Sequence, residues 1–422
     1  MRLPVLFLAA VFAAAAQTPE LSPAETEKAD LSRAVNDAAG SPTDFIRALE
    51  KHLAKYPQSA DRAQIEKALA KTAMEQNDRA RILLYGQRVL SAEPKSTDLQ
   101  LIDRVTRTIL DSDDAESGRK ALVLAKRYEG LVESMRSRSG EGHMSAGQWD
   151  EEVNKGKARA LVLEARATGN AGNPEEAAKL AKSAWESQPN AEAAREMGRW
   201  LTKLGRDAEA AECYANAFTI EDGRSTEADR AKDREHLHEV FTKLHGSEQG
   251  LGDLILRAYD RMAAMKKERL AQGRLKDPNM GATELGEFTI PNVDGTGSLS
   301  LASLKGKAVV MDFWATWCGP CRVQHPMIEN VKKRFEKAGN VVFLSVDSDE
   351  DHAAVAPFLK EMKWEHPVYF DAGLGSLLKI TAIPTIVILD SEGKLSSRMA
   401  GFLPERFEDM LAQRIEEAQP KQ

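Results

Sequence analysis

Most of the chain carries a hydrophobic pattern with helical spacing. One run of such apolar positions is Ala121, Leu122, Leu124, Ala125 and Tyr128. These stretches are rich in Ala, Leu, Glu, Lys and Arg, which favour helix, and they lack proline over Lys95–Asn173 and Asn190–Asp277. Strand-like alternation is rare before Phe288. The pattern therefore predicts an all-helical region over residues 41–272.

Small residues recur at one offset inside this region. Ala165 and Gly198 are 33 positions apart (198 − 165), and the same offset joins Gly172 to Gly205, Ala177 to Ala210 and Ala184 to Ala217. Small side chains let antiparallel helices approach closely, and the glycines suit turns. The unit Asn190–Asp222 resembles a tetratricopeptide repeat, although Ala194 stands where that family has an early tryptophan. A non-repeating helical bundle is the alternative.

The pattern changes after Ala271. Helix-breaking residues follow at Gly273, Asp277, Pro278, Asn279, Gly281 and Gly286, which predicts a linker over residues 273–286. Beyond it, short β-branched runs alternate with helical stretches; the runs are Phe288–Ile290, Ala308–Phe313, Val341–Val346 and Thr385–Leu389. This alternation predicts a separate α/β domain over residues 287–417, followed by a tail at 418–422.

The N-terminus has the layout of a secretory signal peptide. In Met1–Ala16, Arg2 precedes about a dozen apolar residues, and Ala14 and Ala16 form a small-residue cleavage site. The apolar run is shorter than the roughly 20 residues that span a bilayer. We therefore expect a signal peptide at 1–16, a flexible segment at 17–40, and a protein exported to a bacterial periplasm and soluble after cleavage. An uncleaved anchor or a buried helix is the alternative.

Composition narrows the classes of function. The chain has 422 residues, which indicates two or three domains, and 58 Lys+Arg against 65 Asp+Glu give a net charge of −7. Such a chain has no basic excess for nucleic acid. Three cysteines exclude a disulfide-stapled scaffold. Two of them, Cys318 and Cys321, are nevertheless three positions apart, in a protein expected to enter an oxidising compartment.

The cysteine pair stands where a buried strand should end and a helix should begin. The apolar run Ala308–Trp317 leads into Cys318-Gly319-Pro320-Cys321. At a helix start, the helix dipole and free backbone N–H groups favour a thiolate, the nucleophile of disulfide exchange. Cys321 lies one turn on and is placed to resolve a mixed disulfide. Pro320 suits a first helical turn.

Two other interpretations of the pair are weaker. Zinc would draw on Cys318, Cys321 and His325, whereas a structural zinc site needs four ligands. We therefore expect no metal and no cofactor beyond the redox-active disulfide, with His325 on the helix surface. A purely structural disulfide would close a loop too short to restrict the unfolded chain much.

The residues from Phe288 to Glu417 resemble the TlpA/ResA type of exported thioredoxin-fold thiol–disulfide oxidoreductases, whose entry segment is shared with redoxins. The resemblance rests on Leu299–Cys321, which contains WCGPC, and on Ile383-Pro384-Thr385. It implies a thioredoxin fold with a cis peptide bond before Pro384, opposite the thiols. It also implies that Trp317, Gly319, Pro320, Ile383 and Thr385 surround the place where a substrate docks.

Asp312 lies six residues before Cys318 in an otherwise apolar strand. The resemblance to thioredoxin implies a buried acid that relays protons to the resolving cysteine, and burial would raise its pKa. A carboxylate at a strand edge is the alternative. Gln324 departs from the family, whose members commonly carry Glu there.

The leading hypothesis is a periplasmic oxidoreductase that reduces protein disulfides, because the Gly-Pro pair between the cysteines resembles that of thioredoxin, a reductant. It implies a membrane thiol electron donor and protein disulfide substrates, with apocytochrome the family's common target. It also implies a protein partner at the helical repeats.

Two alternatives to that hypothesis stay open. One is a thiol peroxidase of the redoxin class, since Thr316 is near Cys318, although no proline stands in Ala308–Trp317. The other is a partner-binding scaffold that carries a redox domain. Among the remaining residues, Cys213 is expected to be a buried packing residue rather than a regulatory thiol. The run Asp347–Asp351 lacks the Gly and Glu of a calcium loop and is expected to be a solvated helix start.

Overall fold

The computed structural model describes residues 22–38, 40–137, 144–402 and 404–420. The chain divides into two compact units, residues 1–112 and 113–422. The predicted signal peptide at 1–16 lies outside the described residues, as do the last two residues of the predicted tail. Within the described ranges, no helix combines the length and apolarity needed to cross a bilayer.

The first unit is helical and has no strand among its described residues. Its elements are α1 (Pro23–Asp37), α2 (Pro42–Lys55), α3 (Arg62–Glu75), α4 (Arg79–Arg81), the π-helical η1 (Ile82–Gly86), α5 (Gln87–Ala92) and α6 (Leu99–Leu110). Helices α1, α2, α4 and α6 begin after a Ser or Asp whose side chain accepts a backbone hydrogen bond, as good N-cap residues do. The segment 17–40, expected to be flexible, thus includes helix α1.

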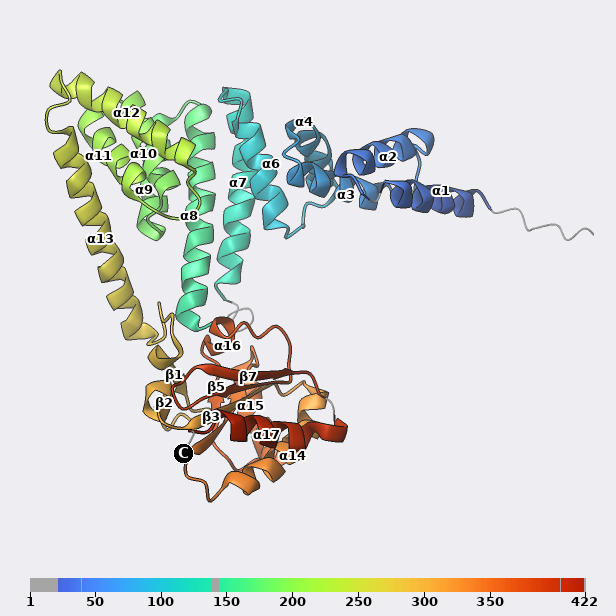
Figure 1. Cartoon of the computed structure of the whole chain (residues 1–422). Coiled ribbons are helices and arrows are strands. Elements are labelled where there is room, and N and C mark those ends of the chain that lie inside the picture. Colours follow the sequence, from blue (N-terminus) through green and yellow to red (C-terminus); the bar gives the residue numbers. More distant parts are fainter. Residues whose placement is uncertain (1–21, 39, 138–143, 403, 421–422) are drawn as a thin grey trace, which may run out of the picture. The chain divides into compact units, whose positions relative to one another are not determined.

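The second unit begins with seven further helices. They are α7 (Ala115–Met135), α8 (Ala146–Asn170), α9 (Pro174–Ser187), α10 (Ala191–Lys203), α11 (Asp207–Thr219), α12 (Glu227–His245) and α13 (Leu251–Lys276). Successive helices from α7 to α12 pack against each other (Figure 1). The predicted all-helical architecture is confirmed. Helix α13 continues to Lys276, so the first four residues of the predicted linker at 273–286 are helical.

Small residues sit where these helices meet. A Cβ added at Gly169 would lie 2.3 Å from the Trp200 ring, and one added at Gly198 would lie 3.0 Å from Tyr214. Gly172 and Gly205 have positive φ values of 103° and 71° in the turns after α8 and α10. The close approach and the turn glycines follow the sequence pattern, while the tetratricopeptide repeat itself stays a prediction.

The remainder of the second unit is the α/β fold that the sequence predicts. Its strands are β1 (Thr289–Pro291), β2 (Ser298–Ser300), β3 (Ala308–Trp314), β4 (Val341–Asp347), β5 (Val368–Phe370), β6 (Thr385–Leu389) and β7 (Leu395–Ala400), and its helices are α14 (Gly319–Phe335), α15 (Val355–Met362), α16 (Leu374–Leu377) and α17 (Phe407–Ala418). Strands β1 and β2 form a hairpin, and the other five form one sheet in the order β5-β4-β3-β6-β7. Strand β3 pairs parallel with β4 and antiparallel with β6.

Strand β3 is buried on both faces, which explains why all its residues except Asp312 are apolar. Successive side chains of a strand point to opposite faces. Met311 and Phe313 join a core that includes Leu374 and Leu378 on one face. On the other face, Ala308 and Val310 pack with residues of α14 and α17. Asp312 is two positions after Val310 and so points to the same face of the sheet. Its carboxyl therefore lies on the face that α14 covers.

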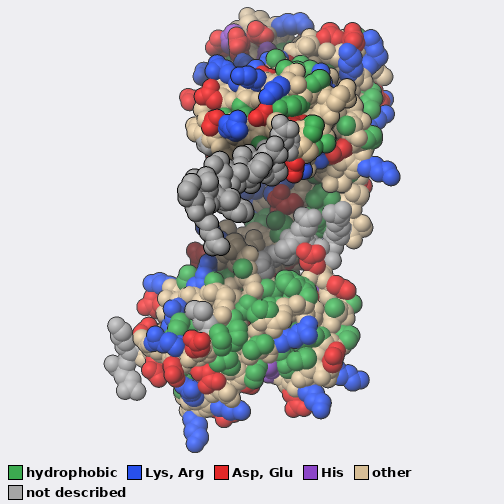
Figure 2. All heavy atoms as spheres, turned by 90° about the vertical axis from the view of Figure 1, so that its right-hand side faces the viewer, with side chains coloured by type: hydrophobic (Ala, Val, Ile, Leu, Met, Phe, Trp, Pro, Cys, Tyr) green, Lys and Arg blue, Asp and Glu red, His purple; other side chains and the backbone are tan. Residues whose placement is uncertain are grey.

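Figure 2 shows one face of the molecule with Lys and Arg interspersed among Asp and Glu. Outside the area that the undescribed residues cover, this face carries no extended field of one sign. Such a mixed surface matches the small net charge of −7. It differs from the basic stripe that binds a polyanion.

Candidate active site

Cys318 and Cys321 lie at the first turn of α14 and are joined by a disulfide, with their Cα atoms 5.3 Å apart. Cys318 is the N-cap residue, and its Sγ accepts a hydrogen bond from the backbone N–H of Cys321 at 3.2 Å. Gly319 and Pro320 fill the first two helical positions, where a missing N–H leaves no helical bond unmade. The strand–cysteine–helix arrangement predicted from the sequence is therefore present.

The N-cap of α14 differs in chemistry from those of the other capped helices that the structure describes. Elsewhere, Ser, Thr, Asp or Asn side chains accept the backbone hydrogen bond, as at Ser145 and Asn173. At α14 a sulfur takes that place. The positive end of the helix dipole and the unpaired N–H groups stabilise a negative charge there. When the disulfide is reduced, this position favours the thiolate of Cys318.

Two tryptophans beside the pair have opposite exposures. Trp317, directly before Cys318, is 69% exposed, whereas Trp314 is 1% exposed and packs in the same hydrophobic cluster as both cysteines. The Trp314 indole N–H donates to Ser345 Oγ at 2.7 Å. Both cysteines are 4% exposed. Trp317 is therefore the exposed aromatic side chain next to the buried disulfide.

The Ile383–Pro384 peptide bond is cis, as the resemblance predicts. Ile383 packs against the hydrophobic cluster that contains the two cysteines. Thr385 opens β6 opposite Phe313 of β3, and its Oγ1 donates to the carbonyl of Ala382 at 2.7 Å. The two sequence motifs that lie more than sixty positions apart are thus brought together.

Asp312 is the one acidic residue of β3, where it pairs with Ser345 and Ile386. Its side chain is buried, and Oδ1 has no hydrogen-bond partner. Burial raises the pKa of this carboxyl to about 7, because a charge without partners is costly in a low-dielectric interior. The alternative of a carboxylate at a strand edge does not match this burial in the central strand of the sheet.

The inward side of α14 lies over the face of the sheet that carries Asp312. Its buried residues are Cys321, Gln324, Ile328 and Val331, which follow helical spacing. Gln324 is 1% exposed, and neither its oxygen nor its nitrogen has a hydrogen-bond partner. Two unpartnered polar groups, the Gln324 amide and the Asp312 carboxyl, therefore lie beneath the first half of α14.

The expectation of a solvated helix start at Asp347–Asp351 is wrong for its first half. Asp347 ends β4 and is 1% exposed, and Asp349 is also buried. Burial, followed by the hydrogen bond and charge of Asp349, raises the pKa of Asp347 to about 9. Asp349 accepts hydrogen bonds from Thr316 N at 2.6 Å and Thr316 Oγ1 at 2.8 Å. Asp349 thus fixes the loop before Trp317, a role that its sequence position alone did not indicate.

His325, expected on the helix surface, is half-buried. Its ring stacks on Trp364 at 3.6 Å between centroids and lies 4.9 Å from the ring of His366. Atoms of His325, Glu329 and His366 lie within 4.8 Å of one another, the only such group of metal-binding side chains in the described ranges. The two imidazoles are only 25° from parallel, so their nitrogen lone pairs do not converge, and Lys332 Nζ already lies 3.2 Å from Glu329 Oε1. We therefore assign no metal to this group.

The fold and the paired cysteines define a thioredoxin-like domain. The model of the Thioredoxin-like family matches residues 306–395. A thiol-disulfide oxidoreductase ResA from Bacillus thuringiensis is 31% identical over 121 residues, which cover 28% of this chain and 68% of the relative. A thiol:disulfide interchange protein DsbE from Pseudomonas fluorescens is 29% identical over 141 residues, covering 32% and 76%. A solved structure of a DsbE-type protein from Chlorobium tepidum has a TM-score of 0.29 and 31% identity, covering 31% of this chain and 92% of that one.

The chain belongs to the ResA-type thiol–disulfide oxidoreductases. It is accordingly a thiol–disulfide oxidoreductase with a thioredoxin fold. The family model lies wholly within the α/β part. The helices α1–α13 stand outside that match, so their role rests on their own structure.

Proposed function

We propose that this chain is an exported oxidoreductase that reduces disulfides of other proteins through Cys318 and Cys321. The observation that carries the proposal is the bond between the two cysteines at the first turn of α14. The helix dipole stabilises a sulfur at that position in its thiolate form. The thiolate is the attacking species in thiol–disulfide exchange.

The proposed reaction takes two exchange steps. The Cys318 thiolate attacks a substrate disulfide, forms a mixed disulfide and releases one substrate thiolate. Cys321 then loses its proton and attacks Cys318 Sγ, which restores the Cys318–Cys321 bond and releases the second substrate thiolate. Two electrons pass to the substrate, and a dithiol donor must return them; a membrane thiol carrier is the donor that we propose.

Neighbouring residues support these steps. Asp312, with its pKa near 7, is suited to accept the proton of Cys321 and to return it. The exposed ring of Trp317 and the half-buried side chain of Ile383 lie beside the pair and are proposed to contact an extended substrate chain. Thr385 is 3% exposed, so its side chain is not part of that surface, contrary to the docking role that the resemblance implies. The Gly319-Pro320 pair, which is like that of thioredoxin, favours the reductive direction.

The location and the partners are further parts of the proposal. The Met1–Ala16 segment supports export to a periplasm, where a paired thiol needs a source of electrons. Protein disulfides are the proposed substrates, and apocytochrome thiols are one family target. The packed helices α7–α13 are proposed to hold a protein partner.

Trapping in the full chain tests the order of the two cysteines. Cys321→Ser, after reduction, should attack a protein disulfide through Cys318 and stop at the mixed disulfide, which a non-reducing gel displays. The matched control is the same chain with Cys318→Ser added, which should trap nothing. A Cys321→Ser chain that forms no mixed disulfide, or a double variant that still does, contradicts the assignment.

A further inference from the structure

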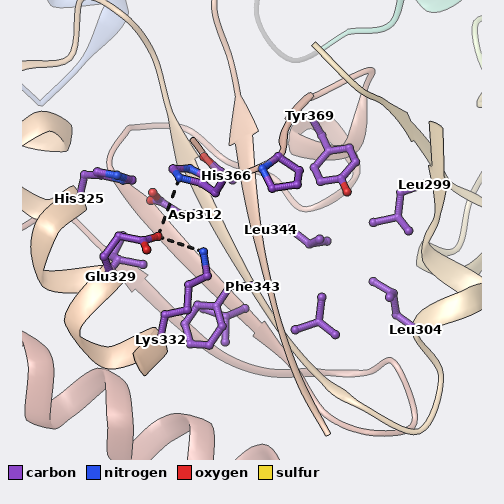
Figure 3. Close-up of a pocket in the computed structure, with 15 residues that line it drawn as sticks. Leu299, Leu304, Asp312, His325, Glu329, Lys332, Phe343, Leu344, His366 and Tyr369 are labelled. Atoms are coloured by element: carbon purple, nitrogen blue, oxygen red, sulfur yellow. Dashed lines mark hydrogen bonds and ion pairs between the residues drawn. The ribbon is translucent and has the colours of Figure 1, made fainter. Parts of the chain in front are cut away.

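A cavity of about 180 Å³ is lined by α14, by β3 and β4, and by Leu299 and Leu304, which pack on the opposite face of the sheet. In liquid water each molecule occupies about 30 Å³, so this cavity has room for several water molecules. Figure 3 shows that Asp312, His325, Glu329 and His366 gather at one end, while Leu299 and Leu304 line the other. The polar end is the place where water would have hydrogen-bond partners.

The polar end leads from a buried acid toward solvent. Asp312 is buried and Oδ1 lacks a partner. The side chains of His366 and Glu329 are 15% and 33% exposed, and His366 Nδ1 lies 3.9 Å from Glu329 Oε1. Three elements contribute these groups, namely β3, α14 and the segment before β5. His325, Glu329 and His366, which are in contact with one another, therefore line the same end of the cavity as Asp312.

We propose that His366, His325 and Glu329, with water in this cavity, carry protons between solvent and Asp312. The proposal rests on the proposed function, in which Asp312 exchanges a proton with Cys321. These three residues are positioning residues, since they act through Asp312 and touch neither sulfur.

The protonation states of these groups suit the role. Burial, together with the nearby His366, lowers the pKa of His325 to about 4, and burial also lowers the pKa of His366. A neutral imidazole holds a proton on one nitrogen and accepts one on the other. The other titratable groups that line the cavity are Lys332, whose ammonium pairs with Glu329, and Tyr369, whose pKa burial raises.

The relay is needed when a donor reduces the Cys318–Cys321 bond. A dithiol thiolate attacks Cys318 Sγ, the S–S bond breaks, and its electron pair leaves on Cys321 Sγ. Cys321 is 4% exposed, so this thiolate takes its proton from the Asp312 carboxyl. The second thiol of the donor, as a thiolate, then attacks the donor sulfur of this mixed disulfide. The bond to Cys318 Sγ breaks, Cys318 leaves as a thiolate, and the donor is released as a disulfide. Above the pKa of Asp312 this carboxyl is already ionised and has no proton to give. The proton for Cys321 must then reach Asp312 from solvent through the cavity.

The test is the rate at which dithiothreitol reduces the full-length oxidised chain, followed by Trp fluorescence across pH. His366→Phe should slow the reduction about tenfold above pH 7, relative to wild type at the same pH, and leave it unchanged near pH 6, where Asp312 still holds its proton. Glu329→Gln, at a half-exposed position that tolerates an isostere, should give the same pH-dependent loss to a smaller extent. The matched control is His352→Phe, because His352 also stacks on an aromatic ring, Phe370 at 3.8 Å, but does not line the cavity.

A second comparison separates a relay from a packing effect. In an Asp312→Asn background, His366→Phe should cause no further slowing, since the group through which it acts is gone. Equal slowing at every pH, slowing that persists in the Asp312→Asn background, or no effect from either cavity variant overturns the relay. In all three cases the trapping result for Cys321→Ser is unaffected, so the proposed function is judged separately.

Discussion

The cysteines of the two regions are almost equally buried, yet their chemistry differs. Cys213 lies inside α11 and is 6% exposed, and Cys318 lies at the start of α14 and is 4% exposed. Burial raises the pKa of the Cys213 thiol to about 12, with smaller contributions from Glu209 and Glu212. Accessibility therefore does not separate the reactive thiol from the inert one.

Position along a helix separates them. In the middle of α11 each backbone N–H is already bonded within the helix, so a thiolate of Cys213 would find no donor. At the N-cap of α14 the backbone N–H groups are free of helical partners, and one of them points to Cys318 Sγ. The same residue type is a packing side chain in one region and a nucleophile in the other, because the backbone around it differs.

The largest expected effect is a difference in alkylation rate. After reduction of the native chain near neutral pH, iodoacetamide should modify Cys318 at least about 10³-fold faster than Cys213, because only the thiolate reacts. Mass spectrometry of timed samples measures both sites in one experiment. Modification of Cys213 at a rate comparable to that of Cys318 would contradict the difference in thiol reactivity. The control is the urea-unfolded chain, in which all thiols should react alike.

The next effect concerns the buried acid of the α/β part. Asp312→Asn should slow the resolution of a mixed disulfide above pH 7 by about 10–100-fold and remove the inflection near pH 7 from the rate profile. Stopped-flow measurement of product thiol release from pre-reduced chain gives this rate. A profile that keeps the inflection shows that another group supplies it.

The same substitution has a signed effect on stability. The folded pKa of Asp312, about 7, lies above the unfolded value of 3.8, so ionisation destabilises the fold progressively as pH rises between the two. Near pH 8, Asp312→Asn should therefore raise the free energy of unfolding by up to about 4 kcal/mol, and the unfolding temperature with it. At pH 4 the substitution should give no gain in stability. A stability gain that does not depend on pH would contradict the burial of an ionisable carboxyl.

A smaller effect concerns the loop before Trp317. Asp349→Ala removes two hydrogen bonds to Thr316 and should lower stability by about 1–3 kcal/mol and slow exchange several-fold. The matched control is Asp351→Ala in the same segment, which only removes an exposed bond to Ala353 N. Thermal unfolding and single-turnover rates distinguish the two, and equal losses in both variants would mean that Asp349 has no special role.

The helical region should affect stability without affecting the chemistry. Gly169→Ala brings a Cβ within 2.3 Å of Trp200 and should destabilise the helices by about 1–3 kcal/mol. Gly252→Ala in α13 meets no neighbour within 4 Å and should stabilise by about 0.5–1 kcal/mol. Both variants should reduce a small disulfide at the wild-type rate. A changed rate in Gly169→Ala would show that the helices act on the thiol pair.

The sequence predicted the fold and the centre of the site because both follow local rules. Apolar spacing separates the helices from the α/β part, and the strand–cysteine–helix order places Cys318 at a helix start. The burial of Asp349 and the stacking of His325 on Trp364 could not be predicted in this way. They depend on which elements pack together, and neither residue belongs to a periodic pattern. Gln324 illustrates the limit, since the sequence marked it as unusual but not as a buried, unpartnered amide.

The most direct test of the central claim compares one serine substitution in each region. The pre-reduced full chain is mixed with insulin, and the loss of insulin disulfides is followed. Cys213→Ser should retain the wild-type rate, and Cys318→Ser should abolish the reaction. Retained reduction by Cys318→Ser, or its loss in a folded Cys213→Ser chain, would contradict the claim that the N-cap thiol of α14 is the nucleophile.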